Sequence, residues 1–166
     1  MIDYVTIRNK IVSGLYKHLN HPIVPADQTA NRPPYPFVTY KFVSLYTPET
    51  GFKSIHQQND LNPDADITQV YTEQPTMVLS LTAISKQDID SADLAQRIRD
   101  WFTIQGYDYL KELNIVVVEA TAINDRSTLM IDEYEVKYGF DVRIRVLDKV
   151  TLTKSRIVIA NTNRVE

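Results

Sequence analysis

The chain has 166 residues and a mass of 19.1 kDa, a size typical of one domain. Apolar residues make up 43%, which excludes a disordered chain, and no apolar run approaches the length that spans a bilayer. The formal charge of −3 argues against nucleic-acid binding through bulk electrostatics and leaves room for a local basic patch.

The sequence has no cysteine, which excludes disulfides, thiolate metal sites and cysteine nucleophiles. It begins Met1-Ile2-Asp3-Tyr4, without the basic and then apolar segments of a signal peptide. We therefore expect synthesis in the cytoplasm, no membrane anchor and no membrane partner.

The first part of the chain contains one helix signal and one strand signal. Apolar residues at helical spacing predict a helix over Asp3–Leu19 with one buried stripe. Most of the eight prolines follow in Pro22–Pro36. Because proline fixes φ and lacks an amide donor, this segment is expected to be an extended connector, neither helix nor inner strand. Aromatic and β-branched residues then predict a strand over Phe37–Tyr46.

The segment Thr47–Gln74 is polar but carries scattered apolar residues, among them Ile55, Leu61 and Ile67. A structureless loop of this length is rare in a compact domain. We therefore expect residues 47–75 to form a projecting hairpin or loop, or a segment that becomes ordered on a partner.

The middle of the chain alternates between strand and helix signals. A second strand is predicted over Thr76–Ser85, and the helix after it is expected to end at Gly106 in the left-handed conformation that favours glycine. A short helix over Tyr107–Leu113, a strand over Ile115–Ala122 and a turn at residues 124–127 follow.

The longest alternation runs from Glu133 to Leu147, with apolar side chains at even positions and mostly charged side chains at odd positions. It predicts a long antiparallel strand whose even face holds the core and whose odd-numbered charges serve assembly. Residues 151–166 are expected to be a C-terminal strand or arm, with a strand-like stretch at Arg156–Ala160. The elements together predict an α+β fold. We expect one domain over residues 1–150, with helices packed on one face of a mainly antiparallel sheet.

Residues that could carry chemistry have simpler structural explanations. The four glycines lie too far apart for a phosphate-binding loop, and no serine lies in a nucleophile elbow. His18 and His21, with Asp27 nearby, fit the end of a helix better than a metal site, because histidine there interacts favourably with the helix dipole.

One pattern imitates an enzyme. Pro63-Asp64 and Glu135-Val136-Lys137 resemble the carboxylates and lysine of metal-dependent nucleases. Their separation exceeds the usual hairpin geometry, and Glu135 and Lys137 are explained as alternating members of a polar strand face. We predict no catalytic residues, no cofactor and no metal.

Aromatic residues cluster around the first predicted strand and could stack on nucleic-acid bases: Tyr35, Tyr40, Phe42 and Tyr46. Only Arg32 and Lys41 accompany them, which is too little basic surround for an RNA-binding sheet. Use in the core or at a protein interface is the favoured interpretation.

Three distributed stretches resemble tailed-bacteriophage neck or tail terminator proteins. They are Pro33–Tyr40, the strand and helix that contain Leu79–Ala83 and Ile98–Phe102, and Asn124–Ser127 leading into Glu133–Val142. The similarity covers about Val5 to Val150 and includes no catalytic signature.

The resemblance implies an α+β subunit that assembles, commonly as a hexameric ring, on the end of the tail tube in the neck of the virion. Such a ring stops tube growth and offers the surface to which the head attaches. The partners would be copies of itself, the tail tube protein, a head-completion or connector protein, and phage DNA that passes through the lumen without sequence-specific binding. The alternatives are a different head-to-tail connector, such as an adaptor ring protein, and a metal-dependent nuclease. The residues expected at interfaces are Arg126, Glu133, Glu135, Lys137, Arg143, Arg145, Ile55, Leu61 and Ile67.

Overall fold

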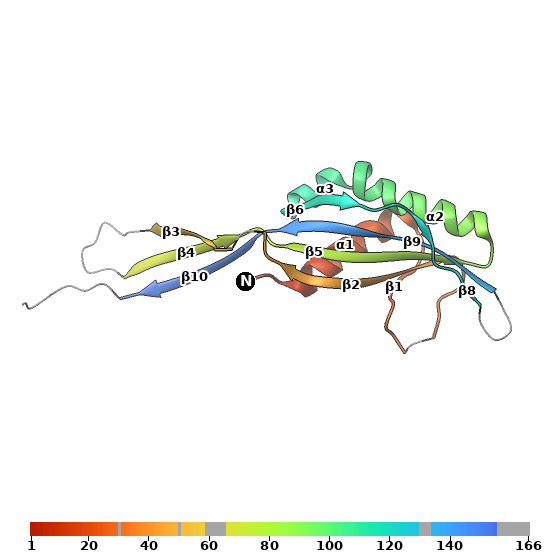
Figure 1. Cartoon of the computed structure of the whole chain (residues 1–166), viewed down its shortest axis with the longest axis horizontal. Helices are drawn as coiled ribbons and strands as arrows, with labels where there is room; N and C mark the ends of the chain where they lie inside the picture. Colours follow the sequence, from red (N-terminus) through yellow and green to blue (C-terminus); the bar gives the residue numbers. More distant parts are fainter. Residues whose placement is uncertain (30, 50, 59–65, 130–133, 156–166) are drawn as a thin grey trace, which may run out of the picture.

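The computed structural model describes residues 1–29, 31–49, 51–58, 66–129 and 134–155. These residues form two β-sheets, the larger of which carries all the described helices (Figure 1). We call the larger one the body sheet. Its main strands lie in the order β1 (Ile23–Pro25), β2 (Phe37–Thr47), β5 (Thr76–Ser85), β9 (Tyr134–Val146) and β6 (Ile115–Ala120). The pairs are antiparallel except that β1 runs parallel to β2.

Two short strands, β7 (Asn124–Asp125) and β8 (Thr128–Leu129), pair with β9 beyond the end of β6. Strand β6 ends two residues before the predicted limit at Ala122, next to an irregularity in its pairing with β9. The predicted α+β fold with a mainly antiparallel sheet is confirmed.

The helices form where the sequence provides an apolar stripe and a cap. Helix α1 (Tyr4–Leu19) starts at Asp3, whose side chain accepts a hydrogen bond from the Thr6 amide at 3.0 Å. It ends at Asn20, which adopts the left-handed conformation. Helix α2 (Asp88–Asp100) carries acidic residues in its first turn, where their negative charges interact favourably with the positive end of the helix dipole. None of the described helices is long and apolar enough to cross a membrane.

The prediction that Gly106 ends a helix in the left-handed conformation is wrong. Helix α2 continues through a π-helical turn, η1 (Trp101–Gln105), into α3 (Tyr107–Glu112), and Gly106 between them has φ −88°. A Cβ at this position would lie 2.7 Å from the indole of Trp101. Glycine is therefore needed for the close approach of the tryptophan.

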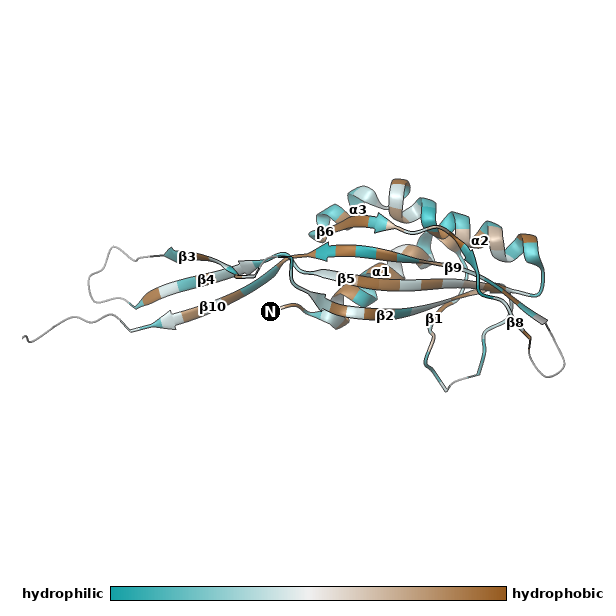
Figure 2. Cartoon of the chain, viewed as in Figure 1, coloured by the Kyte–Doolittle hydropathy of each residue, from teal (hydrophilic) through white to brown (hydrophobic). Residues whose placement is uncertain are grey.

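One apolar core lies between the helices and one face of the body sheet. Its largest fully buried side chains come from α1, α2, η1, α3, β2, β5 and β9: Ile11, Leu15, Ile98, Phe102, Leu110, Val38, Met77, Leu79, Leu81, Phe140, Val142 and Ile144. The alternating brown bands of β5 and β9 mark the residues of this face (Figure 2). On β9, the even-numbered residues Val136, Phe140, Val142, Ile144 and Val146 are buried, as the alternation predicts.

The second sheet, which we call the arm, projects from one end of the body sheet (Figure 1). It contains β10 (Asp148–Lys154), β4 (Ile67–Glu73) and β3 (Ser54–Gln58), all antiparallel. Strand β4 leads into β5 through two residues, and β9 leads into β10 through Leu147. The two central strands of the body sheet thus continue into the arm. The strand predicted at Arg156–Ala160 lies outside the described residues.

Candidate functional site

The face of the body sheet opposite the helices is polar, and we call it the open face. Side chains alternate along a strand, so the residues between the core positions point away from the helices. The cross-strand pairs place these residues in neighbouring rows: Thr39 with Thr82, Lys41 with Ser80 and Asp141, Val78 with Arg143, and Thr76 with Arg145 and Val116. None of the described helices lies on this face (Figure 1).

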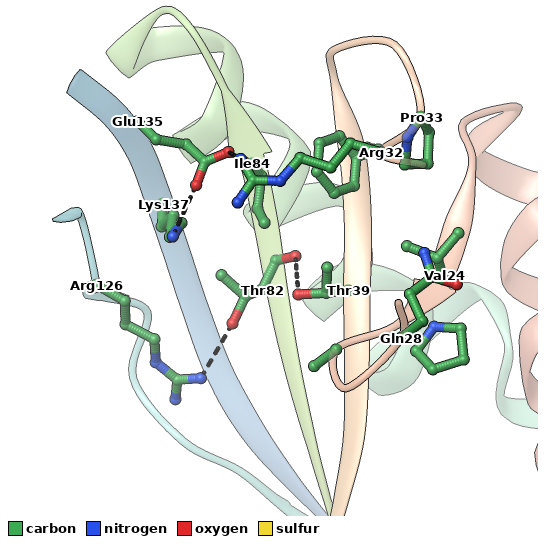
Figure 3. Close-up of a pocket in the computed structure, with 13 residues that line it drawn as sticks. Val24, Gln28, Arg32, Pro33, Thr39, Thr82, Ile84, Arg126, Glu135 and Lys137 are labelled. Carbon is green, nitrogen blue, oxygen red and sulfur yellow. Dashed lines mark hydrogen bonds and ion pairs between the residues drawn. The ribbon is translucent and has the colours of Figure 1, made fainter. Parts of the chain in front are cut away.

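Arg126, which lies between β7 and β8, reaches across the open face. Its guanidinium donates a hydrogen bond to Thr82 Oγ1 at 3.3 Å (Figure 3). It also donates to Ser80 Oγ at 2.8 Å and lies 3.0 Å from Asp141 Oδ1. Burial raises the pKa of Asp141, but its hydrogen bonds and the charge of Arg126 outweigh this effect and hold the pKa below its ordinary value. Arg126 therefore ties together three side chains of β5 and β9.

Glu135 is only 4% exposed, so it is not an accessible surface charge. Its Oε1 accepts hydrogen bonds from the Arg32 guanidinium and from the Tyr35 hydroxyl, both at 2.8 Å. Its Oε2 lies 2.7 Å from the Lys137 ammonium. Burial raises the pKa of Glu135, yet Lys137, Tyr35 and Arg32 together lower it below its ordinary value. The proline-rich connector covers this carboxylate and is anchored by it.

A hollow of about 340 Å³ lies between that connector and the open face (Figure 3). Its polar lining comes from Gln28, Arg32, Thr39, Thr82, Arg126, Glu135 and Lys137. The carboxylate here is already neutralised by two cations, which leaves it poorly suited to hold a divalent metal.

The nuclease-like pattern does not come together as a site in the described part of the chain. Asp64 lies outside that part, and Glu135 and Lys137 form an ion pair with each other. Among the described residues there is no group of three or more His, Asp or Glu side chains that could hold a metal ion, and this includes His18, His21 and Asp27.

Arg143 and Arg145 lie on the half of the open face next to the arm. Arg143 forms an exposed ion pair with Glu119 at 3.0 Å. Arg145 has no ion pair with the described residues and lines two hollows of about 200 and 440 Å³ at the base of the arm. Beside it, Val116 is 44% exposed. This half of the open face thus combines apolar surface with an unneutralised cation.

The arm has one apolar and one polar face. The pairing of β3, β4 and β10 places five apolar or aromatic side chains on the same side, and we call this set the apolar face of the arm: Ile55, Ile67, Tyr71, Val150 and Leu152. Gln57, Gln69 and Lys154 lie on the same side, toward the tip of the arm. The other side carries mainly polar groups, among them Ser54, His56, Thr72 and Thr151, and its apolar member is Val70. Ile55 is 59% exposed and Leu152 45%. No described helix packs on either face (Figure 1).

The base of the arm is held by two buried carboxylates, Glu73 and Asp148, which lie opposite each other on β4 and β10. Lys53 Nζ lies 2.6 Å from Asp148 Oδ2 and 3.8 Å from Glu73 Oε2. The Tyr46 hydroxyl donates to Glu73. The hydrogen bond from Lys53 holds the pKa of Asp148 below its ordinary value. These groups fix the arm where it leaves the body sheet.

The described residues that were predicted at interfaces lie on two surfaces. Arg126, Lys137, Arg143 and Arg145 lie on the open face, with Glu135 buried at its end. Ile55 and Ile67 share the apolar face of the arm. Glu133 and Leu61 lie outside the described residues. The sequence did not reveal that Arg32 and Tyr35 contact Glu135, or that Lys53 contacts Glu73 and Asp148. In each case the two groups lie far apart along the chain.

The family model of the phage neck terminator protein matches residues 9–166 of the chain. This protein belongs to that family. Among curated proteins, none matches the chain. The family assigns the chain to the structural proteins of the bacteriophage neck, where it lies in the virion and contacts other tail and head proteins. The open face and the arm are therefore surfaces of a neck terminator protein.

Proposed function

We propose that this neck terminator protein forms a hexameric ring on the end of the tail tube, stops tube growth and offers the surface to which the filled head attaches. The observation that carries the proposal is the arm, an amphipathic sheet whose apolar face is not covered by the described part of its own chain. A small sheet needs a partner on its apolar face to be stable. A subunit of a ring obtains that partner from its neighbours.

The open face supports the same proposal. It carries hydroxyl groups, paired charges and exposed valines, and this mixture of polar and apolar groups is typical of protein interfaces. A face that served only as solvated surface would need neither the buried Glu135 nor the Arg126 network to fix its geometry.

We further propose that phage DNA passes through the lumen of the ring without sequence-specific binding, and that the protein has no catalytic activity. The net charge of −3 suits passage of DNA better than its retention, because a basic lumen would hold the phosphates. The paired state of Glu135 and Lys137 argues against metal-dependent hydrolysis.

Electron microscopy of the purified protein, alone and with tail tubes, tests the ring and its position. We expect hexameric rings, tubes of uniform length and one capped tube end. A protein that stays monomeric in the presence of tubes contradicts the proposal. Rings that bind head connectors and ignore tubes would instead indicate a head-to-tail adaptor.

Incubation with duplex and single-stranded DNA and Mg²⁺ or Mn²⁺ tests the absence of catalysis. We expect intact DNA at all times. Cleavage by the wild type that is lost in Glu135→Gln would show a nuclease.

A further inference from the structure

We propose that the arm of one subunit docks, through its apolar face, on the half of the next subunit's open face formed by Val78, Val116 and Arg145. This inference rests on the proposed ring and specifies the contact that builds it. The occupant is a second copy of this chain.

The donor surface is the apolar face of the arm. Ile55 on β3 and Val150 on β10 flank Tyr71 on β4, so the apolar stripe crosses all three strands, with Leu152 next along β10. The residues at its two edges are about half exposed. An exposed apolar surface of this kind on a soluble subunit marks a protein contact.

The acceptor surface matches it in chemistry. Val116 and Arg145 are cross-strand neighbours on β6 and β9, and Val78 lies in the adjacent row on β5. The valines provide apolar area. Arg145 is a cation that no described side chain neutralises, and it faces hollows that a partner can fill.

Charges of both signs lie at the edges of the two surfaces. On the donor, exposed Asp66 directly precedes Ile67 of the apolar stripe, and Lys154 is the cross-strand neighbour of Ile67. On the acceptor, Arg145 lies one row from Glu119, which pairs with Arg143. The carboxylate of Asp66 can therefore meet Arg145 across the contact while the ammonium of Lys154 meets Glu119. Opposite charges at the edge of an interface favour one orientation of docking.

The geometry requires two different copies. The arm projects away from its own body sheet and so does not cover its own open face (Figure 1). Donor and acceptor are different surfaces, which makes the contact head-to-tail, and repetition of such a contact closes into a ring when the rotation permits.

The test uses one variant defective in each surface. The arm variant carries Ile55→Asp and Leu152→Asp. The face variant carries Val116→Asp and Arg145→Glu. The matched control for the arm is His56→Asp with Thr151→Asp, which places the same charges on the same strands but on the opposite, exposed face. Lys17→Glu on α1 is the control for charge reversal. Circular dichroism verifies that each variant is folded.

Light scattering at a concentration where the wild type forms rings gives the result. We expect each double variant to be monomeric, with a dissociation constant raised at least about 10-fold, and both controls to form rings. An equimolar mixture of the two double variants should form heterodimers but no rings. One member supplies an intact face, the other supplies an intact arm, and only one contact forms.

The outcomes separate this contact from the proposed ring. An arm variant that still forms rings, or a mixture that contains only monomers, overturns the contact and leaves the ring in place. A mixture without heterodimers likewise contradicts the proposed contact, and it is the result that an arm-to-arm contact would give. A wild-type protein that forms no ring, alone or on tail tubes, overturns the proposed function and this inference together.

Discussion

The guanidinium of Arg32 lies 2.8 Å from the carboxylate of Glu135, across 103 positions of the sequence. This ion pair joins the proline-rich connector to the start of β9, at the end of the sheet far from the arm (Figure 1). Lys137 neutralises the other oxygen of the same carboxylate at 2.7 Å. One buried carboxylate thus holds the connector against the start of β9.

We predict that Glu135→Ala lowers the free energy of unfolding by about 2–4 kcal/mol, because the ammonium of Lys137 then loses its partner in a partly buried site. Glu119→Ala, which removes the exposed partner of Arg143, is the control and should cost less than about 1 kcal/mol. Urea unfolding of both variants measures the difference. Equal effects would show that the Glu135 pair is no stronger than a surface pair.

The same carboxylates make stability depend on pH. The pKa values of Glu135 and Asp148 are lower in the folded protein than their ordinary values of 4.5 and 3.8. A carboxylate with a lowered pKa adds stability above its unfolded pKa and loses that contribution as the pH falls through its folded pKa. We therefore expect constant stability from about pH 8 to 5 and a progressive loss below about pH 4.5.

Urea midpoints between pH 3 and 8 check this expectation. Glu135→Gln should be less stable at neutral pH than the wild type and should lose less stability on acidification, because its side chain no longer binds a proton in that range. A wild-type profile that is flat down to pH 3 would be inconsistent with the lowered pKa values.

The parts of the fold that were predicted from the sequence are those with a local pattern. The stripe of α1 and the alternation of β5 and β9 each lie within one segment, so periodicity reveals them. The partner of Glu135 is different, because no local pattern points from β9 to Arg32. Residues 47–75 were expected to project and residues 151–166 to form a C-terminal strand or arm. That β10 starts at Asp148 and pairs with β4 was not expected, since nothing in the alternation at Leu147 signals that β9 passes from one sheet to the other.

Gly139 lies beneath Arg126 on the open face. A Cβ there would lie 2.6 Å from the Leu81 carbonyl oxygen and 3.0 Å from Cδ of Arg126. We predict that Gly139→Ala costs about 1–3 kcal/mol, because the backbone of β5 cannot move without breaking the sheet. Gly51→Ala, where nothing lies within 4 Å, is the matched control and should be close to neutral. Thermal unfolding of both variants decides the matter, and similar melting temperatures would contradict the prediction.

The two faces of β9 should respond differently to charge. Val142 is fully buried in the core, so Val142→Asp places an unpaired carboxylate there and should unfold the protein, whose total stability is about 5–15 kcal/mol. Val118→Asp on the exposed surface of β6 is the control and should leave the fold intact. Circular dichroism distinguishes the two variants, and a Val142→Asp variant that remains folded would show that Val142 is not part of the core.

Reversal of both arginines on the other face, Arg143→Glu with Arg145→Glu, should leave the monomer folded and weaken assembly. Exposed charges add little to the free energy of folding, whereas like charges across an interface oppose docking. Light scattering measures assembly, and complementation of a terminator-deficient phage measures function. A double variant that assembles and complements like the wild type would show that these arginines are only a solvated surface.

Strand β3 should become protected only on assembly. All of Ser54–Gln58 is exposed, and the strand is paired on one side by β4 alone, so its amides are held by a sheet edge with little burial. Local stability follows burial, and we therefore expect these amides to exchange rapidly in the isolated subunit and slowly in the ring. The amides of β5, which lie in the centre of the body sheet between β2 and β9, serve as the internal control and should be protected in both states. Hydrogen exchange read by mass spectrometry resolves the two strands. Strong protection of β3 in a verified monomer would mean that the arm is already stable alone, and that its apolar face does not need a neighbour.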